Sequence, residues 1–265
     1  MIIDSNANLT NSEFRDLRYI EDTVREAKNA GVFCCIEPCF LEGADVALEL
    51  HHKYPEFVHP AVGLPGAEVK KVRWKERKAL EAYAQLSSVV AIGEIGLDYT
   101  GSLFSQNRLS QKRWLRFQMK TAERCKLPVI IRSNAHHRVL ALLKRYRGQG
   151  NGGIIRTDNL TVEDAIAYMR LGYHISIGSD ILYETGEHIR ELVRRIPLTR
   201  IILESGGHFA KPDWDVRGES ESIFPKVIQR IAELKNVSKN VAEQVIAKNT
   251  IDLLKMTVIY KGWEA

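Results

Sequence analysis

Long apolar segments are missing from this chain of 265 residues, although 45% of its residues are hydrophobic. No run approaches the roughly 18–20 apolar residues that a membrane-spanning helix needs. The first residues, Met1-Ile2-Ile3-Asp4, lack the basic and apolar regions of a secretory signal. We therefore expect a cytoplasmic protein with no membrane partner, long enough to bury a full core.

Cysteine is scarce, with four residues, and none of them has the spacing of a metal-binding knuckle. Cys34 and Cys35 are neighbours in an apolar stretch, so on a strand their side chains point to opposite faces. Together with Cys39 and Cys125 they are typical of buried, reduced thiols in a reducing compartment.

A strong excess of one charge is also absent, since the formal net charge is +5 and the pI is about 8.9. Basic residues are spread along the chain, for example at Lys70, Lys71, Arg113 and Arg116. This balance permits a nucleic acid or another acidic partner without requiring one.

What the chain does contain is a regular alternation of short β-rich apolar runs and long amphipathic stretches. Eight strands, each followed by a helical pattern, predict parallel strands joined by crossovers. Their number favours an α/β fold of the (β/α)8 TIM-barrel type, with residues 1–265 as a single domain. A doubly wound open sheet also fits the periodicity alone. The predicted strands are Ile2–Ser5, Val32–Pro38, Val58–Gly63, Val89–Glu94, Val129–Arg132, Gly153–Thr157, His174–Gly178 and Ile201–Glu204, and helices are predicted at Phe14–Asn29, Gln106–Lys126, Thr161–Leu171, Glu187–Ile196, Ile223–Leu234 and Lys239–Leu254.

The carboxyl ends of the strands are where a (β/α)8 barrel carries its site. Charged side chains of both signs stand there, and such charges are costly to bury unless they pair or bind something. Two interpretations stay open: an internal salt-bridge cluster that closes the barrel, or a polar pocket for a ligand. The residues concerned are Glu94, Arg132, Arg156 and Glu204, with Asp4 and Asp158 close by.

The most specific segment is Ala91-Ile92-Gly93-Glu94-Ile95-Gly96-Leu97-Asp98-Tyr99. Gln111, Phe117-Gln118-Met119 and Leu127-Pro128-Val129-Ile130-Ile131 follow it. In order and spacing, these segments resemble the TatD family of metal-dependent deoxyribonucleases, which have an amidohydrolase-like TIM-barrel fold. The resemblance spans nearly the whole chain. It implies a hydrolase that uses one to three divalent ions to cut DNA at phosphodiester bonds.

This sequence departs from the family's ligand pattern at most positions. The two histidines of the family's D-S-H-x-H-L motif are Asn6 and Asn8 here, and the histidines after the fifth and sixth strands are Arg132 and Arg156. The aspartate of the L-E-T-D motif is Gly206. Of the ligands that the resemblance implies, Glu94 is retained, and Glu204 remains beside the lost aspartate.

These replacements change the coordination chemistry. A guanidinium has no available lone pair and does not deprotonate in proteins. An asparagine oxygen coordinates mainly as one of several hard ligands for calcium or magnesium. Glu94 with two amides is too little for an ordinary two-metal site. We therefore expect no metal cofactor, with weak magnesium binding as the remaining alternative.

The remaining histidines do not restore a ligand set. His136 and His137 begin a helix and diverge, and His174 lies within a strand. Only His208 falls on a loop beside the barrel mouth, so the predicted ligand pocket includes it. No GxSxG elbow or Cys–His arrangement indicates a replacement nucleophile.

The arginines at the mouth allow two roles. They can neutralise Glu94 and Glu204 by bidentate pairing, which requires at least one guanidinium within salt-bridge distance of Glu94. Alternatively, they can hold a phosphate or a carboxylate, with Asn6 and Asn8 as added hydrogen-bond donors.

Three functions from different classes remain. The leading hypothesis is a catalytically inactive TatD-like pseudoenzyme that acts in binding or assembly with a protein partner. The second is a divergent metal-dependent hydrolase with Glu94, Glu204 or Asp158 as candidate catalytic residues. The third is a nucleic-acid-binding module that does not cleave its ligand.

Overall fold

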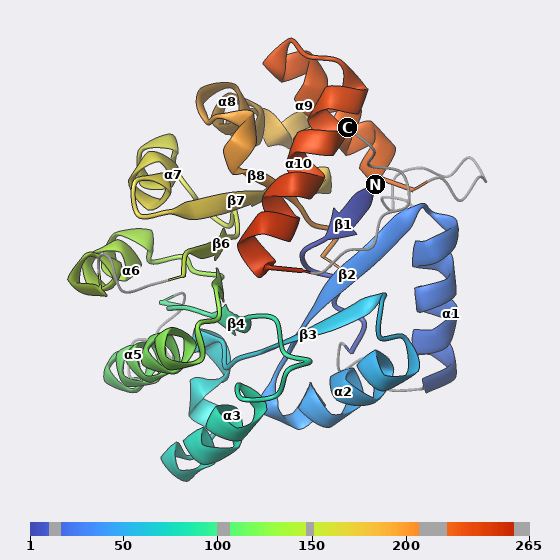
Figure 1. The fold of residues 1–265 in the computed structure, drawn as a ribbon. Helices are drawn as coiled ribbons and strands as arrows, with labels where there is room; N and C mark the ends of the chain where they lie inside the picture. The colour runs from blue at the N-terminus through green and yellow to red at the C-terminus, as the bar shows by residue number, and fades with distance from the viewer. Residues whose placement is uncertain (11–16, 100–106, 147–150, 207–221, 257–265) are drawn as a thin grey trace.

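The computed structural model describes residues 1–10, 17–99, 107–146, 151–206 and 222–256. Within them the chain forms a ring of parallel strands surrounded by helices (Figure 1). The strands are β1 (Ile2–Asp4), β2 (Val32–Cys39), β3 (Val58–Val62), β4 (Ile92–Ile95), β5 (Val129–Ile131), β6 (Gly153–Ile155), β7 (Tyr173–Ile177) and β8 (Ile201–Leu203).

The ring closes at two junctions between the edges of two sheets, which we call seams. β1, β2 and β3 pair in one sheet, and β4 to β8 pair in order in a second sheet. A bridge between Ala61 and Ala91 joins the two sheets, and Val62 N donates to Ala91 O at 3.2 Å. At the other seam Ser5 N donates to Leu203 O at 2.9 Å. The structure is therefore a closed (β/α)8 barrel, and the open-sheet alternative is wrong.

Helices cover the outside of the barrel by burying an apolar stripe against it. In α8, Ile189, Leu192 and Val193 are buried at helical spacing. Thr161 caps α7 by accepting from Asp164 N at 3.1 Å, and Ser238 caps α10 in the same way. The helices described are α1 (Leu17–Asn29), α2 (Ala44–Lys53), α3 (Arg77–Tyr83), α5 (Arg108–Cys125), α6 (His136–Leu143), α7 (Val162–Met169), α8 (Glu187–Arg195), α9 (Phe224–Lys235) and α10 (Lys239–Leu254).

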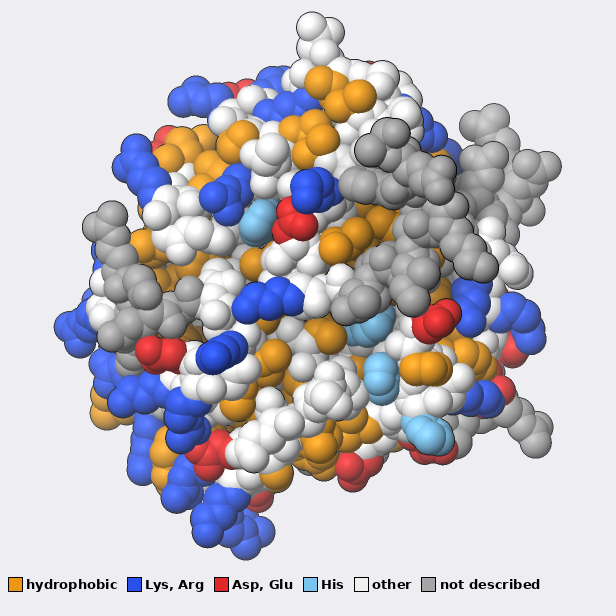
Figure 2. Space-filling model, in the orientation of Figure 1, with side chains coloured by type: hydrophobic (Ala, Val, Ile, Leu, Met, Phe, Trp, Pro, Cys, Tyr) orange, Lys and Arg blue, Asp and Glu red, His pale blue; other side chains and the backbone are white. Residues whose placement is uncertain are grey.

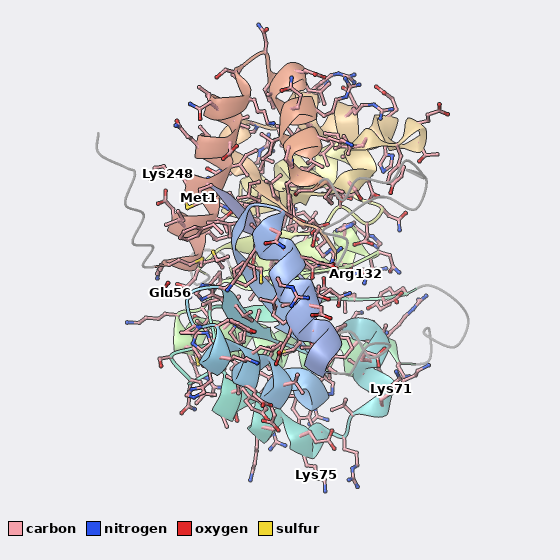
Figure 3. All side chains as sticks on the ribbon, turned by 90° about the vertical axis from the view of Figure 1, so that its right-hand side faces the viewer. Met1, Glu56, Lys71, Lys75, Arg132 and Lys248 are labelled. Carbon is pink, nitrogen blue, oxygen red and sulfur yellow. The ribbon has the colours of Figure 1, made fainter. Side chains whose placement is uncertain are left out.

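The barrel interior is apolar in its middle layer and at its amino end. α10 crosses that end in front of the strands in Figure 1, and its last residue, Leu254, packs into the interior cluster. Figure 3 shows Met1 and Glu56 at this end and Arg132 at the opposite end. The two ends of the barrel therefore differ in chemistry. The interior cluster is completed by Ile36, Ala61, Ala91, Ile130, Ile154 and Ile202.

Most predicted elements agree with the structure to within a few residues, and α10 has the predicted bounds. The fourth strand is shifted: Val89–Glu94 was predicted, whereas β4 spans Ile92–Ile95, and Ala91 before it forms an isolated bridge with Ala61. The predicted start of the first helix, Phe14, lies outside the described residues. In the described part of the chain, no helix has both the length and the apolarity to cross a membrane.

Candidate functional site at the carboxyl end of the barrel

The charged residues at the barrel mouth continue the alternation of the strands. Side chains two residues apart on a strand share a face. Ile130, Ile154 and Ile202 point into the barrel interior. Arg132, Arg156 and Glu204 each follow one of these isoleucines by two residues, which places them on the same face, one layer nearer the mouth.

Arg156 is the centre of the site. Its Nη1 lies 2.5 Å from Oε1 of Glu94, and its Nε lies 3.3 Å from Oε2 of Glu204. Nε also lies 3.9 Å from Oδ2 of Asp158. The side chain of Arg156 is 14% exposed, and those of Glu94 and Glu204 are 11% and 9% exposed. One buried guanidinium thus pairs with both buried glutamates.

Arg132 lies on the rim of the mouth. Its side chain is 54% exposed, its Nε lies 3.4 Å from Oδ2 of Asp158, and its Nη1 lies 4.0 Å from Oε2 of Glu94. Figure 3 shows Arg132 at the mouth end of the molecule. The expectation that at least one arginine contacts Glu94 is confirmed, most closely by Arg156.

Two uncharged side chains complete the pairing. Ser176 on β7 donates its hydroxyl to Oε2 of Glu204 at 2.6 Å. The Asn6 amide is oriented with its oxygen toward Arg156, where it accepts from Nη1 and, at 3.2 Å, from Nη2. The Asn6 oxygen thus serves Arg156, while its NH2 group keeps two hydrogen-bond donors. That Asn6 donates to a ligand stays a prediction.

The electrostatics favour a charged Arg156. Burial lowers the pKa of Arg156, but Glu204, Glu94 and Asp158 outweigh burial and raise it above its ordinary value. Burial raises the pKa of Glu204, and the Arg156 charge and the Ser176 hydroxyl oppose that rise. Three carboxylates and two guanidiniums give this cluster a formal charge of −1. This sign argues against a phosphate as the ligand of the mouth.

Another buried carboxylate, that of Asp4, connects the end of β1 to Ser205, which follows β8. Its Oδ1 accepts from the backbone of Asn6 and of Ser205, both at 2.9 Å, and its Oδ2 accepts from the Ser205 hydroxyl at 2.5 Å. Burial raises the pKa of Asp4 to about 6, although these hydrogen bonds lower it. Asp4 therefore holds the barrel seam and is not part of the ion-pair cluster.

His136 positions the segment that carries Asp158. Its Nε2 lies 2.8 Å from the backbone oxygen of Asp158, so this nitrogen carries the proton and donates. Its Nδ1 then accepts from the hydroxyl of Tyr168 at 3.2 Å. His136 is buried, and both of its ring nitrogens have hydrogen-bond partners.

Two predicted pocket residues, Asn8 and His208, remain to be placed. Asn8 is half-buried and adopts a left-handed φ of 49°. His208 lies outside the described residues. Sequence reasoning also missed Ser176 and Ser205. Ser176 could have been found from its interior position on the seventh strand, whereas Ser205 has no local signal for its contact with Asp4.

Among the described residues, the donor set at the mouth does not fit a divalent metal ion. Each oxygen of Glu94 lies within 4.0 Å of a guanidinium nitrogen, and Oε2 of Glu204 lies 3.3 Å from another. An arginine cannot coordinate, because it has no free lone pair, and its fixed charge repels a cation. The carboxylates of the cluster are thus already paired with guanidiniums of the chain itself.

Comparison with known proteins identifies the fold and the family together. The family model described as "TatD related DNase" matches residues 3–255. An uncharacterized metal-dependent hydrolase of Bacillus subtilis, YabD, is 27% identical over 97% of this chain and 100% of its own length. Human deoxyribonuclease TATDN3 is 28% identical over 96% of this chain and 94% of its own length. The crystal structure of YjjV, a TatD homologue from Escherichia coli, superposes with a TM-score of 0.85 at 25% identity, covering 96% of this chain and 98% of that one. This chain belongs to the TatD family of metal-dependent hydrolases and deoxyribonucleases.

Proposed function

We propose that this chain is a TatD-family pseudoenzyme, in which the Arg156 guanidinium takes the place of the metal ions and the barrel serves binding or assembly. One observation carries the proposal: a single buried guanidinium contacts Glu94 at 2.5 Å and Glu204 at 3.3 Å. Glu94 and Glu204 are therefore both engaged in ion pairs with a side chain of the chain itself.

Hydrolysis by this family's chemistry needs a metal ion to activate water and to stabilise the charge on the phosphate. Arg156 supplies positive charge, but it cannot lower the pKa of a bound water by coordination. Asp158 is also paired, with Arg132 Nε at 3.4 Å and Arg156 Nε at 3.9 Å. No carboxylate of the cluster is thus left as an unpaired general base.

The divergent-hydrolase alternative requires a different arrangement of the same residues. It requires Arg156 to leave Glu94 and Glu204 so that an ion, such as weakly bound magnesium, can enter. Since the guanidinium is buried and pairs with both, removing it costs several kcal/mol before any ion binds. The geometry favours the inactive alternative for this reason.

A nuclease assay tests the proposal directly. Single-stranded and double-stranded DNA are incubated with the protein and magnesium, manganese or zinc, beside the matched variant Glu94→Gln. We expect no cleavage above that of the variant. Metal-dependent cleavage that is lost in Glu94→Gln would overturn the proposal and establish the hydrolase alternative.

A further inference from the structure

Positive charge is concentrated in one sector of the barrel exterior. Residues 66–81 and 107–126 contain thirteen Lys or Arg and four Asp or Glu side chains, a net charge of +9. The whole chain carries +5, so all other residues together carry −4. Figure 2 shows Lys and Arg side chains gathered at the lower left, over α3 and α5. The net charge of the whole chain is therefore small, although these two segments are strongly basic.

The two segments fold onto each other. The Arg124 guanidinium on α5 pairs with Glu81 on α3 at 2.5 Å. The 3-10 helix η3 (Trp74–Glu76), just before α3, contacts the same helix, because the Trp74 ring packs edge-on against Trp114 at a centroid distance of 5.1 Å. Figure 3 shows Lys75 at the lower edge of the molecule and Lys71 at its right, on the same side as Arg132. The two basic segments therefore lie side by side on the barrel exterior.

An exposed stripe runs along α5 within this surface. Leu109, Arg113, Arg116 and Lys120 follow one another at spacings of four, three and four residues, so they share one face of the helix. At about 1.5 Å per residue the stripe is roughly 16 Å long. Leu109 is 82% exposed, the highest value among the exposed large hydrophobic side chains of the described residues.

Two guanidiniums of the surface are held in place before any partner binds. Arg113 lies over the Trp74 ring, 3.8 Å from its centroid, and Arg77 lies over it at 5.3 Å. Arg77 also donates from Nη1 to the backbone oxygen of Trp74 at 3.1 Å. Such stacking reduces the side-chain entropy lost when the arginines later bind a carboxylate.

We propose that this surface, the basic face, docks an acidic protein segment that places an apolar side chain against Leu109. Arginine pairs with carboxylates in bidentate geometry, and an apolar contact surrounded by charge is the usual arrangement of a protein interface. The basic face consists of Trp74, Arg77, Leu109, Arg113, Arg116 and Lys120.

The same observations disfavour a nucleic acid as the partner. A phosphate backbone offers no apolar group to Leu109. Bases stack on open aromatic rings, but the Trp74 ring is already covered by Arg113 and flanked by Trp114 and Phe117. The basic face also lies on the outer helices, apart from the ion-pair cluster inside the mouth.

Three fluorescent probes of equal charge test the proposal by anisotropy. They are a glutamate-rich peptide containing leucines, the same peptide with serine in place of each leucine, and a single-stranded oligonucleotide. We expect the leucine peptide to bind most tightly. Its affinity should fall about tenfold or more in the double variant Arg113→Glu/Arg116→Glu. Leu109→Ser should weaken the leucine peptide to the level of the serine peptide and leave the serine peptide unchanged.

The matched control is Arg195→Glu/Lys239→Glu, which reverses two exposed charges outside the basic face. It should retain most of the affinity, and thermal melting of all variants checks that they fold. Tighter binding of the oligonucleotide, equal binding of both peptides, or an equal loss in the control would each overturn the proposal. DNA cleavage at the mouth would overturn the pseudoenzyme proposal and leave this one standing, so the two failures are distinguishable.

Discussion

Arg132 and Arg156 stand at the ends of adjacent strands, yet their surroundings differ. The Arg156 side chain is 14% exposed and pairs with Glu94 and Glu204, whereas that of Arg132 is 54% exposed and pairs mainly with Asp158. The same residue type at equivalent positions therefore has two roles. Burial decides that Arg156 holds the barrel together, while Arg132 remains a rim charge screened by water.

The largest expected effect is that of Arg156→Met. Removing the guanidinium leaves Glu94 and Glu204 buried without a counter-charge, so the free energy of unfolding should fall by about 3–5 kcal/mol. Urea denaturation at neutral pH measures the change. A matched triple variant that adds Glu94→Gln and Glu204→Gln should recover most of the loss, since no unpaired charge remains. If the free energy of unfolding of Arg156→Met fell by less than about 1 kcal/mol, Arg156 would contribute no more to stability than an exposed arginine such as Arg132.

Removing a hydrogen bond to the Asp4 carboxylate, at the β1–β8 seam, should lower the free energy of unfolding by a smaller amount. Ser205→Ala removes the hydroxyl that donates to Oδ2 of Asp4 at 2.5 Å. Hydrogen bonds to charged groups contribute about 1.5–3 kcal/mol, and the same denaturation experiment measures the loss. Ser5→Ala is the control, because the buried Ser5 hydroxyl finds no partner among the described residues. Equal losses in both variants would show that the Asp4 contact is not specific.

Glu37 offers a buried carboxylate that is held without an arginine. It accepts from the backbone of Leu9 at 2.7 Å and from the backbone and hydroxyl of Thr10 at 3.0 and 2.7 Å. Burial raises its pKa to about 7, above its ordinary value, despite these hydrogen bonds. The folded state thus binds this proton more readily than the unfolded state. The stability that Glu37 contributes is present at about pH 4.5 and is lost as the pH rises through 7.

Glu37→Gln should therefore reduce the pH dependence of stability. The gain in melting temperature between about pH 8 and pH 5 should be smaller in the variant than in the original protein. Melting curves in matched buffers measure both slopes, and Glu187→Gln, on the exposed side of α8, serves as a control at these pH values. Identical slopes for Glu37→Gln and the original protein would show that Glu37 does not titrate in this range.

Arg132→Met should have the smallest effect on stability, about 0–1 kcal/mol, because its pairs are exposed to water. Comparing its urea midpoint with that of Arg156→Met sharpens the contrast between rim and centre. Since high salt screens an exposed pair, the difference between Arg132→Met and the original protein should shrink further in salt. A loss of stability near that of Arg156→Met would show that the ion pairs of Arg132 are as shielded from water as those of Arg156.

The sequence predicted the barrel and the strand ends because alternation is a local property. Arg132, Arg156 and Glu204 each follow an interior isoleucine by two residues, so their shared face could be foreseen. Which arginine is buried could not be predicted, because this depends on contacts with residues far away in the sequence, such as Asn6 and Glu94. The contact of Asp4 with Ser205 joins residues 201 positions apart, and no local pattern encodes it.

The role of Asn6 shows a further limit of sequence patterns. An amide carries both a donor and an acceptor, so its residue type does not determine which of them is used. The neighbouring guanidinium decides it, and the Asn6 oxygen accepts from Arg156. The resemblance pointed to Asn6 as a residue of the mouth, but it gave no information about which of its amide atoms contacts Arg156.

The central claim is that the mouth is held by Arg156 in place of a metal ion. The most direct measurement is the melting temperature of purified protein before and after treatment with a strong chelator, with elemental analysis of the same samples. We predict an unchanged melting temperature and no stoichiometric divalent metal, because nothing that stabilises the native state would be removed. A metal-to-protein ratio near one, together with a fall in melting temperature on chelation that Glu94→Gln abolishes, would contradict the claim.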